Sequence, residues 1–312
     1  MEADFNTALK ILYAKQLMWN AETAALSNNQ WGGRANRSAP DCATRKLLTW
    51  ENARLNKRTV ASFFGDLASC FNRMKTNVST MVAREKGMPL SVCVARSRVV
   101  QTMRRRVRTA AGTSSVSYGE ETGDIPLAGE IQGKGDVMGL WAIVSDSILS
   151  VHHRRCPGIT LEHVATDALT RRTADSYVDD TDNYAAATGA ESYNVPDPDD
   201  PSLWGTSDEA DDPATQVVHD LGASAQLWMN LVLLVGGLMA FHKCLWQILA
   251  WKPLNGRLVP RNLDEVNTEV HLEDHRGIRS KIKQVAHTVA NVGLGFSMVP
   301  TGDQNQSGKG PY

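Results

Sequence analysis

Three aspartates in two separate stretches of the chain could bind a divalent cation together. Asp179 and Asp180 directly follow Tyr177 and Val178, and Asp66 ends an upstream run of β-branched and aromatic residues. Hard divalent cations require clustered oxygen ligands, which carboxylates supply. A lone Asp-Asp pair is usually a solvated loop, so the hypothesis depends on Asp66 lying at the end of a strand that reaches the pair.

The residues around these aspartates predict the backbone that would position them. The stretch 59–66 is rich in β-branched and aromatic residues and predicts a strand that ends at Asp66. The stretch 173–178 predicts a second, short strand, and 179–183 predicts a polar turn. Both acidic groups would therefore lie at strand ends, where the backbone fixes their position.

An ordered set of motifs resembles the palm of reverse transcriptases, in particular reverse-transcriptase-like proteins of retroelements in diatoms and other algae. The Tyr-Val-Asp-Asp sequence at 177–180 and the upstream strand that ends at Asp66 are its centre. The other matching pieces occur in the same order and cover most of the chain: Gln30-Trp31-Gly32-Gly33-Arg34, 66–73, 129–135, and Gly236-Gly237 leading to Lys243-Cys244. The resemblance implies an α+β right-hand polymerase fold, with an antiparallel ferredoxin-like palm sheet backed by two helices.

The same resemblance implies the activity of an RNA-directed DNA polymerase, which transfers a nucleotide to a primer 3′-hydroxyl with two metal ions. Asp66 and Asp179 would be the main ligands of two Mg²⁺ ions, and Asp180 a weaker third ligand. Lys243, which follows a Gly-Gly turn, would protonate the pyrophosphate as it leaves. The alternative for Lys243 is an ordinary surface lysine at a strand edge.

Three further residues would contact the incoming nucleotide by resemblance. Phe71 occupies the position of a steric gate that excludes the ribose 2′-hydroxyl, and a core Phe at the start of a helix is its alternative. Gln132 and Gly133 resemble the segment that contacts nucleotide and template, where glycine lets the backbone approach a base pair. The chain departs from the family pattern at 136–138 and at Asn72, and either departure could weaken activity.

Arginines in two places could contact the phosphate backbone of a template and primer. Arg34 lies in a loop rich in Asn, Gly and Ser, which would be a loop of the fingers. Arg104, Arg105 and Arg106 belong to a basic run on a predicted helix over 89–109. Phosphate contacts of this kind give affinity without sequence preference. The alternatives are an ordinary turn for Arg34 and a solvated helix face for the basic run.

Composition limits the class of protein without indicating its function. The chain has 312 residues, 42% of them hydrophobic, which suffices for a buried core. The formal net charge of −1 does not by itself indicate a nucleic-acid-binding protein. Charge is unevenly distributed, however, because the basic run lies in the first half and a strongly acidic stretch covers 179–212.

Cysteine usage and hydropathy indicate an intracellular protein, in either the cytoplasm or the nucleus. The five cysteines are scattered, odd in number and without a Cys-x-x-Cys pair, which favours a reducing compartment. No signal peptide is visible at the N-terminus. The apolar stretch 227–251 is interrupted by His242 and Lys243, so we expect a buried helix followed by a strand and no membrane span.

The motifs divide the chain into five predicted regions. These are a partial fingers region at 1–58, a palm at 59–180 with a fingers-like insertion around 88–128, an acidic mobile insertion at 181–214, the remainder of the palm at 215–256, and a C-terminal extension at 257–312. Upstream fingers strands and a thumb are not recognisable, which favours a fragment or a degraded copy.

The residues leave two functions open, from different classes. The first is an RNA-directed DNA polymerase domain of a retroelement, with an RNA or DNA template, a primer and deoxynucleoside triphosphates as partners. The second is a degenerate, catalytically inactive palm that acts as a nucleic-acid-binding or structural protein. An RNA-templated RNA polymerase agrees less well with Phe71 and with the Tyr-Val-Asp-Asp sequence. No protein partner is predicted.

Overall fold

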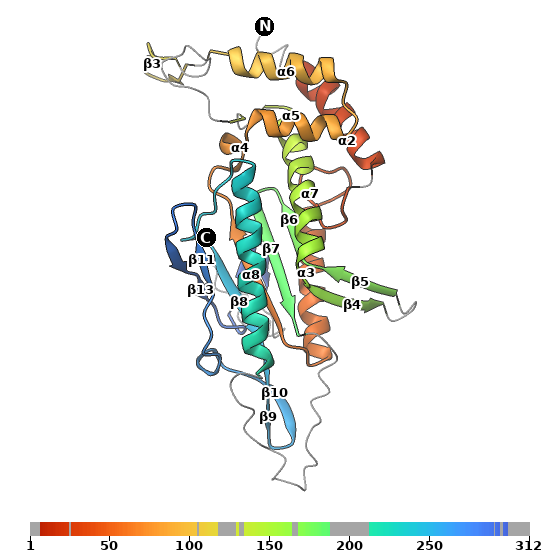
Figure 1. Ribbon diagram of the computed structural model, residues 1–312, viewed down its shortest axis with the longest axis vertical. Coiled ribbons are helices and arrows are strands. Elements are labelled where there is room, and N and C mark those ends of the chain that lie inside the picture. The colour runs from red at the N-terminus through yellow and green to blue at the C-terminus, as the bar shows by residue number, and fades with distance from the viewer. Residues whose placement is uncertain are drawn as a thin grey trace.

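The structure is a computed structural model. It describes residues 7–24, 26–104, 106–117, 129–130, 134–163, 168–187, 212–289, 291–293 and 296–298. The molecule is elongated, with a central sheet flanked by long helices and a cluster of shorter helices at one end (Figure 1).

A five-stranded sheet forms the centre of the fold. Its strand order is β13-β8-β1-β7-β6, and its members are β1 (Val60–Asp66), β6 (Ala174–Tyr177), β7 (Asp180–Ala186), β8 (Leu245–Leu249) and β13 (Lys283–Gln284). The pairs β8–β1, β1–β7 and β7–β6 are antiparallel, and β13 pairs with β8 in parallel. Four of these strands form the antiparallel sheet that the sequence predicted. The fifth strand, β13, is parallel to its neighbour and was not predicted from the sequence.

Two long helices connect the antiparallel strands across one face of the sheet. The chain runs β1–α7–β6–β7–α8–β8, where α7 is Val137–Arg155 and α8 is Pro213–Leu234. With the observed strand order, this is the split βαβ arrangement of ferredoxin-like folds. Asp212 caps α8 by accepting a hydrogen bond from the Ala214 amide, and Pro213 occupies the first turn, where its missing N–H costs nothing.

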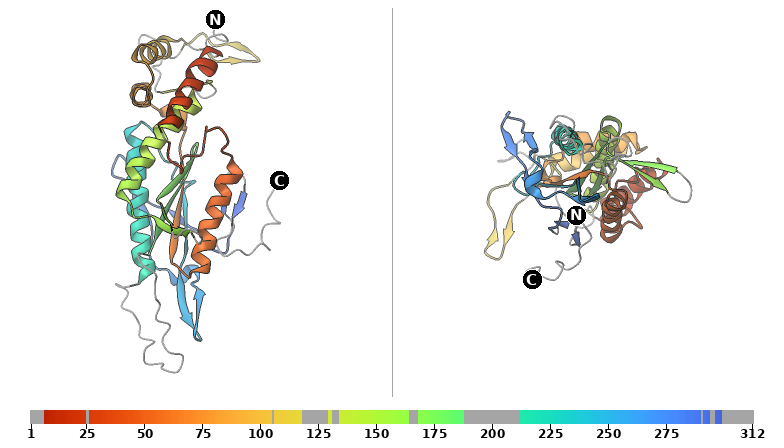
Figure 2. Two further views of the ribbon diagram at one scale, coloured as in Figure 1. Left: turned by 90° about the vertical axis from the view of Figure 1, so that its right-hand side faces the viewer. Right: turned by 90° about the horizontal axis from the view of Figure 1, so that it is seen from below.

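Helix α3 (Ala39–Leu55) covers the opposite face of the sheet (Figure 2). A capping box between Ser38 and Asp41 begins the helix. Its Trp50 packs with Val60 of β1, whereas Phe63 of β1 packs with the residues of α8. Because side chains alternate along a strand, even-numbered residues of β1 face α3 and odd-numbered residues face α8.

Shorter helices gather at one end of the molecule (Figure 1). They are the π-helix η1 (Leu9–Ala14), α2 (Lys15–Thr23), α4 (Cys70–Arg73), α5 (Thr76–Glu85) and α6 (Leu90–Thr102). One apolar cluster joins them to α7, with Leu17, Met74 and Leu140 fully buried. Helices η1 and α2 precede β1 in the chain, and α4, α5 and α6 follow it. Because α4 comes directly after β1, the helical end adjoins the end of β1 at Asp66.

The remaining strands form small hairpins around the sheet. These are β2 (Arg108–Thr109) with β3 (Gly112–Thr113), β4 (Ile159–His163) with β5 (Ala168–Arg172), β9 (Trp251–Leu254) with β10 (Arg257–Pro260), β11 (His271–Glu273) with β12 (Arg279–Lys281), and β14 (Asn291–Gly293) with β15 (Phe296–Met298). A 3-10 turn, η4 (Leu263–Glu265), follows β10.

The hairpin that carries the paired aspartates differs from its prediction. The sequence predicted a polar turn at 179–183, whereas the turn is Val178–Asp179 and strand β7 already begins at Asp180. Residues 181–186 therefore belong to the sheet and not to the predicted acidic insertion. The reason is tertiary, because the α3 residue Lys46 forms a buried ion pair with Asp182 and so allows a carboxylate inside the strand. The rest of that insertion, 188–211, lies outside the described residues.

The predicted helix over 89–109 is also shorter than expected. It ends at Thr102, so Arg104 and Arg106 follow it in irregular backbone, and Arg105 lies outside the described residues. Arg96 of this basic stretch is buried between Glu130 and Asp136. The basic run therefore does not form one solvated helix face, since one of its arginines belongs to the core.

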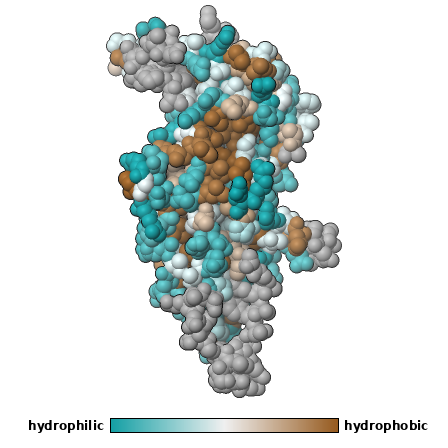
Figure 3. All heavy atoms as spheres, viewed as in Figure 1, coloured by the Kyte–Doolittle hydropathy of each residue, from teal (hydrophilic) through white to brown (hydrophobic). Residues whose placement is uncertain are grey.

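The apolar stretch 227–251 forms the end of α8 and strand β8, as its sequence predicted. Within the part of the chain that the structure describes, no helix has the length and apolar character needed to cross a bilayer. All five cysteines are buried free thiols. On the face shown in Figure 3, apolar residues gather below α5 and over the adjoining halves of α7 and α8. Met81 of α5 and Leu234 of α8 are exposed apolar side chains.

Candidate active site at the end of the central sheet

The fold brings the three predicted aspartates to the same end of the sheet. In the pairing of β1 with β7, Asp66 lies directly opposite Asp180, and Asp179 occupies the turn that precedes β7. Residues opposite each other on antiparallel strands project to the same face, with Cβ atoms about 4.5–5.5 Å apart. Two carboxylates more than 100 residues apart in sequence therefore become immediate neighbours.

This end of the sheet concentrates negative charge. Burial, together with the neighbouring charges of Asp179, Asp182 and Asp66, raises the pKa of the Asp180 carboxyl from 3.8 to about 6. The ammonium of Lys46 opposes this rise. Like charges held close together favour either a shared proton or a bound cation.

Lys243 supplies a cation at this site. Its Nζ lies 2.9 Å from Oδ2 of Asp66, and this ion pair raises the pKa of the lysine. The loop that carries Lys243 is attached to the end of β1, because the Ala240 amide donates to the Asp66 carbonyl and the Ala68 amide donates to the Leu238 carbonyl. The structure thus brings together Asp66 and Lys243, as the resemblance implied.

The carboxylate oxygens of Asp66, Asp179 and Asp180 are of the type that binds a hard cation, although they do not converge on a single point. No group of three or more His, Cys, Asp or Glu side chains within the described part of the chain is arranged as a metal site. The Asp66 carboxylate is directed at the Lys243 ammonium instead. Asp179 is exposed and Asp180 half-buried, so both carboxylates are open to an ion from solution. Carboxylate oxygens of this kind fit Mg²⁺, which keeps several of its own waters.

Phe71 lies near the aspartates at the start of α4. Helix α4 begins only four residues after Asp66, the last residue of β1. Burial raises the pKa of the neighbouring Cys70 thiol, and the charge of Asp179 raises it further. The Phe71 side chain is half-buried and packs against the helical core cluster. Phe71 therefore lies between the helical core cluster and the aspartates at the end of the sheet. The other two predicted nucleotide contacts, Gln132 and Gly133, lie outside the described residues.

Arg34 is engaged inside the protein, whereas the sequence predicted a contact with nucleic acid. Its guanidinium forms an ion pair with Glu22 at 2.6 Å and donates to the carbonyl oxygens of Ser27 and Gln30. These partners give it a structural task, which is to hold the loop against α2. Arg104 and Arg106 are exposed, and the structure does not place them among the aspartates.

A buried polar network between α3 and the sheet was not predicted from the sequence. It contains the ion pairs Lys46–Asp182 and Arg172–Asp175, and the Tyr184 hydroxyl donates to Asp175. One signal was present in the sequence, because Asp180 and Asp182 are two residues apart and so share one face of a strand. That spacing indicates that acidic side chains on one face of β7 extend from the sheet end at Asp180 into the interior at Asp182.

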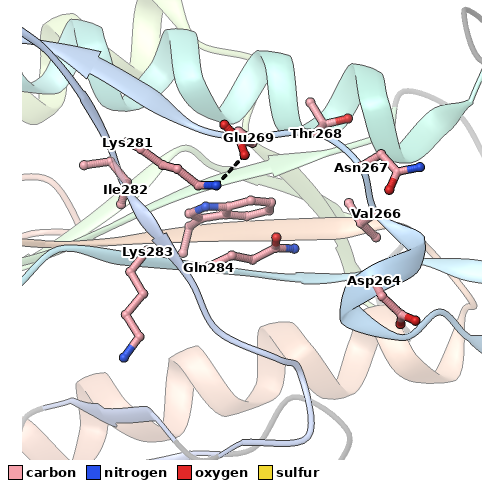
Figure 4. A pocket seen from close by; sticks show the side chains of 10 residues that line it. Asp264, Val266, Asn267, Thr268, Glu269, Lys281, Ile282, Lys283 and Gln284 are labelled. Carbon is pink, nitrogen blue, oxygen red and sulfur yellow. Dashed lines mark hydrogen bonds and ion pairs between the residues drawn. The ribbon is translucent and has the colours of Figure 1, made fainter.

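A separate pocket of about 440 Å³ lies beside β8 (Figure 4). Trp246 forms part of its wall, and Lys281 and Glu269, which also line the pocket, form an ion pair. The indole Nε1 of Trp246 has no hydrogen-bond partner among the described residues. None of the predicted site residues lines this pocket, so it is distinct from the aspartate cluster.

The solved structures to which this chain is similar include two telomerases. The chain is similar to telomerase from Candida tropicalis, with a TM-score of 0.43, and to telomerase from Candida albicans, with a TM-score of 0.40, both in complex with a TWJ fragment of telomeric RNA. Each is 10% identical, and each match covers 78% of this chain and 35% of the telomerase chain. No protein-family model and no curated protein sequence matches the chain.

Proposed function

We propose that this protein is an RNA-directed DNA polymerase domain of a retroelement, which adds deoxynucleotides to a primer 3′-hydroxyl. The observation that carries the proposal is the register of β1 and β7, which sets Asp66 opposite Asp180 with Asp179 in the adjoining turn. The ferredoxin-like strand order supports it, because the two strands that carry the acids are central neighbours in the sheet. An open, acidic strand end of this kind suits phosphoryl transfer, which needs charge neutralisation more than covalent chemistry.

Asp66 and Asp179 would hold two Mg²⁺ ions, with Asp180 as a third, weaker ligand. The bound ions would supply activation of the 3′-hydroxyl and neutralisation of the charge that develops on the phosphates. Burial and the negative charges of both other acids raise the pKa of Asp180, which makes it the weakest of the three ligands. The role of the sheet is to hold the three carboxylates in place before substrate arrives.

Lys243 would donate a proton to the pyrophosphate that leaves. Its side chain is 60% exposed, and its partner among the described residues is Asp66, so it can turn from this carboxylate toward a phosphate at the same site. Phe71 would lie beneath the sugar of the nucleotide, and Gln132 and Gly133 would contact its base. Arg104, Arg105 and Arg106 would contact the phosphate backbone of the template and primer.

Incorporation of labelled deoxynucleotides on a primed RNA template tests this proposal. We expect magnesium-dependent extension by the unmodified protein, and loss of extension by about a hundredfold or more in Asp66→Asn and Asp179→Asn. Both substitutions remove a charge and keep the shape of the side chain. Asp220→Asn, on the outer surface of α8, is the matched control and should extend primers normally.

The same primer-extension experiment distinguishes the proposed polymerase from a catalytically inactive palm. A protein that binds a primed duplex but extends no primer, with RNA or with DNA template, is the degenerate nucleic-acid-binding form. Undiminished extension by both Asp66→Asn and Asp179→Asn would remove the two-metal assignment. Preferential use of ribonucleotides over deoxynucleotides would instead indicate an RNA-templated RNA polymerase.

A further inference from the structure

Val178 has a backbone conformation that its side chain disfavours. It precedes Asp179 in the turn, and its φ is +57°. A positive φ is uncommon for any residue except glycine, and for a β-branched residue it is a genuine outlier because Cβ crowds the backbone. Such a conformation persists only where the surrounding structure enforces it. The neighbours of Val178 therefore decide where Asp179 points.

Trp141 holds the carbonyl end of Val178. The indole lies on α7, is 2% exposed, and donates a hydrogen bond from Nε1 to the Val178 carbonyl oxygen. This is the peptide bond that leads directly into Asp179. A buried donor from a rigid helix thus fixes the orientation of the peptide that precedes the proposed metal ligand.

Gly32 holds the amide end of Val178. A Cβ added at Gly32 would lie 2.5 Å from the Val178 nitrogen and 2.9 Å from its Cγ2. No other residue leaves enough space for this approach, so the need for glycine here comes from packing and not from its own backbone conformation. Val178 is therefore enclosed between Gly32 on one side and Trp141 on the other.

The segment Asn29–Gly32 is itself attached to the sheet and to α7. Gln30 forms a parallel bridge with Ser176 of β6, in which the Trp31 amide donates to the Ser176 carbonyl and the Ser176 amide donates to the Asn29 carbonyl. The side chain of Gln30 is fully buried and donates to the Gly32 carbonyl while accepting from Ser145 of α7. Gly32 thus has a fixed position.

We propose that Asn29–Gly32 and Trp141 form a brace that keeps Val178 at positive φ and thereby holds the Asp179 carboxylate at the end of the sheet. Trp141 and Gly32 are positioning residues, because neither touches the reacting groups. The purpose of the brace rests on the function proposed above, but its physical action on the turn does not. It explains why two sequence-distant pieces, 29–32 and α7, both contact this hairpin.

Hydrogen exchange of the turn tests the brace without any need for activity. Trp141→Phe removes the indole donor and keeps most of the ring, so we expect backbone amides at 177–180 to exchange about tenfold faster. Trp228→Phe is the matched control, because Trp228 is equally buried on the neighbouring helix and its Nε1 has no hydrogen-bond partner within the described chain. This control should leave the turn unchanged.

A second pair of variants tests the contact at Gly32. Gly32→Ala places a methyl group against Val178 and should also accelerate exchange at 177–180. Gly222→Ala, on α8, is its control, because a Cβ at Gly222 meets no atom within 4 Å. In an active protein, Trp141→Phe and Gly32→Ala should lower kcat more than they change KM, since they displace a metal ligand rather than a substrate contact.

A double-mutant cycle with Val178→Gly decides the role of the conformation. Glycine adopts positive φ without strain, so in the Val178→Gly background Trp141→Phe should accelerate exchange far less than in the native background. An undiminished effect of Trp141→Phe in that background, or equal effects of Trp141→Phe and Trp228→Phe on the turn, would overturn the brace. A brace confirmed by exchange in a protein that extends no primer would retain this inference and reject the polymerase.

Discussion

Two groups of carboxylates on the same face of the sheet differ in how their charge is balanced. Asp175 and Asp182 lie in the interior, and each has its own buried cation, Arg172 and Lys46 respectively. At the sheet end, Asp66, Asp179 and Asp180 share one exposed lysine. The first group is an internally neutral network that stabilises the fold, whereas the second retains net negative charge.

The difference follows from solvent access. A carboxylate buried without a partner costs several kcal/mol, so the interior acids require matching cations from α3 and β5. At the strand end water screens the exposed Asp179. Burial of Asp180, together with the charges of its acidic neighbours, carries a moderate cost that appears as the raised pKa of its carboxyl. A surplus of negative charge is therefore tolerated at the end of the sheet, where the sheet meets solvent.

The largest expected effect on stability comes from breaking the interior group. Lys46→Met leaves the Asp182 carboxylate buried without its cation, because both side chains of the pair are 4% exposed. We expect a loss of about 3–5 kcal/mol in the free energy of unfolding, measured by urea denaturation. The double variant Lys46→Met/Asp182→Leu should regain much of that loss. Equal stability of Lys46→Met and the native protein would show that the interior acids, like the exposed ones, do not need their cation.

Phe71 lies at the boundary between the core and the sheet-end site. Because its ring is half-buried, Phe71→Ala should destabilise the protein by less than the about 3–5 kcal/mol of a fully buried Phe. As a gate, its removal should raise ribonucleotide incorporation relative to deoxynucleotide incorporation. Val82→Ala, from the same cluster, is the control and should leave this ratio unchanged. A destabilised Phe71→Ala protein with an unaltered ratio would assign the ring to the core.

Asp180 should make stability depend on pH in a specific direction. The folded protein holds the Asp180 proton up to a pKa of about 6, whereas the unfolded chain releases it near 3.8, so this group lowers stability as pH rises between these values. In chelator-treated protein, Asp180→Asn should match the native protein near pH 4 and exceed it by about 1 kcal/mol at pH 7, a value reduced for partial exposure. Thermal melting across this range measures the difference. A stability difference between Asp180→Asn and the native protein that narrows as pH rises would contradict the raised pKa of Asp180.

Lys243 should have the smallest effect on stability and a large effect on activity. Its side chain is 60% exposed, so Lys243→Ala should change the melting temperature of the protein only slightly. If Lys243 protonates the leaving pyrophosphate, primer extension should fall by about a hundredfold. Lys281→Ala, which breaks another exposed pair with Glu269, is the control and should change neither property. Normal extension by Lys243→Ala would leave Lys243 as a surface lysine.

Local features of the fold could be predicted from the sequence because they depend on neighbouring residues. The strand that ends at Asp66, the buried helix followed by a strand over 227–251 and the strand before the paired aspartates all follow from side-chain type and hydropathy pattern. The α+β class and the ferredoxin-like order of four strands were also expected. The resemblance of the motifs led us to expect Asp66 in the same site as Asp179, Asp180 and Lys243. The catalytic and metal-binding roles of these residues remain predictions.

Features that depend on residues distant in sequence were not predictable. The strand character of 181–186 depends on Lys46, and the burial of Arg96 depends on Glu130 and Asp136. The internal ion pair of Arg34 and the parallel strand β13 likewise require partners that no local pattern indicates.

The residue types alone establish which side chains could do chemistry at this site, since carboxylates and an ammonium are properties of side chains. Which of those charges are neutralised inside the protein, and which remain open, depends on how the chain folds. The conformation of Val178 depends on the fold as well, because a β-branched residue adopts positive φ only when Trp141 and Gly32 enforce it. The physical reason is that burial and packing energies depend on contacts across the chain, whereas strand and helix preferences depend on neighbours within it.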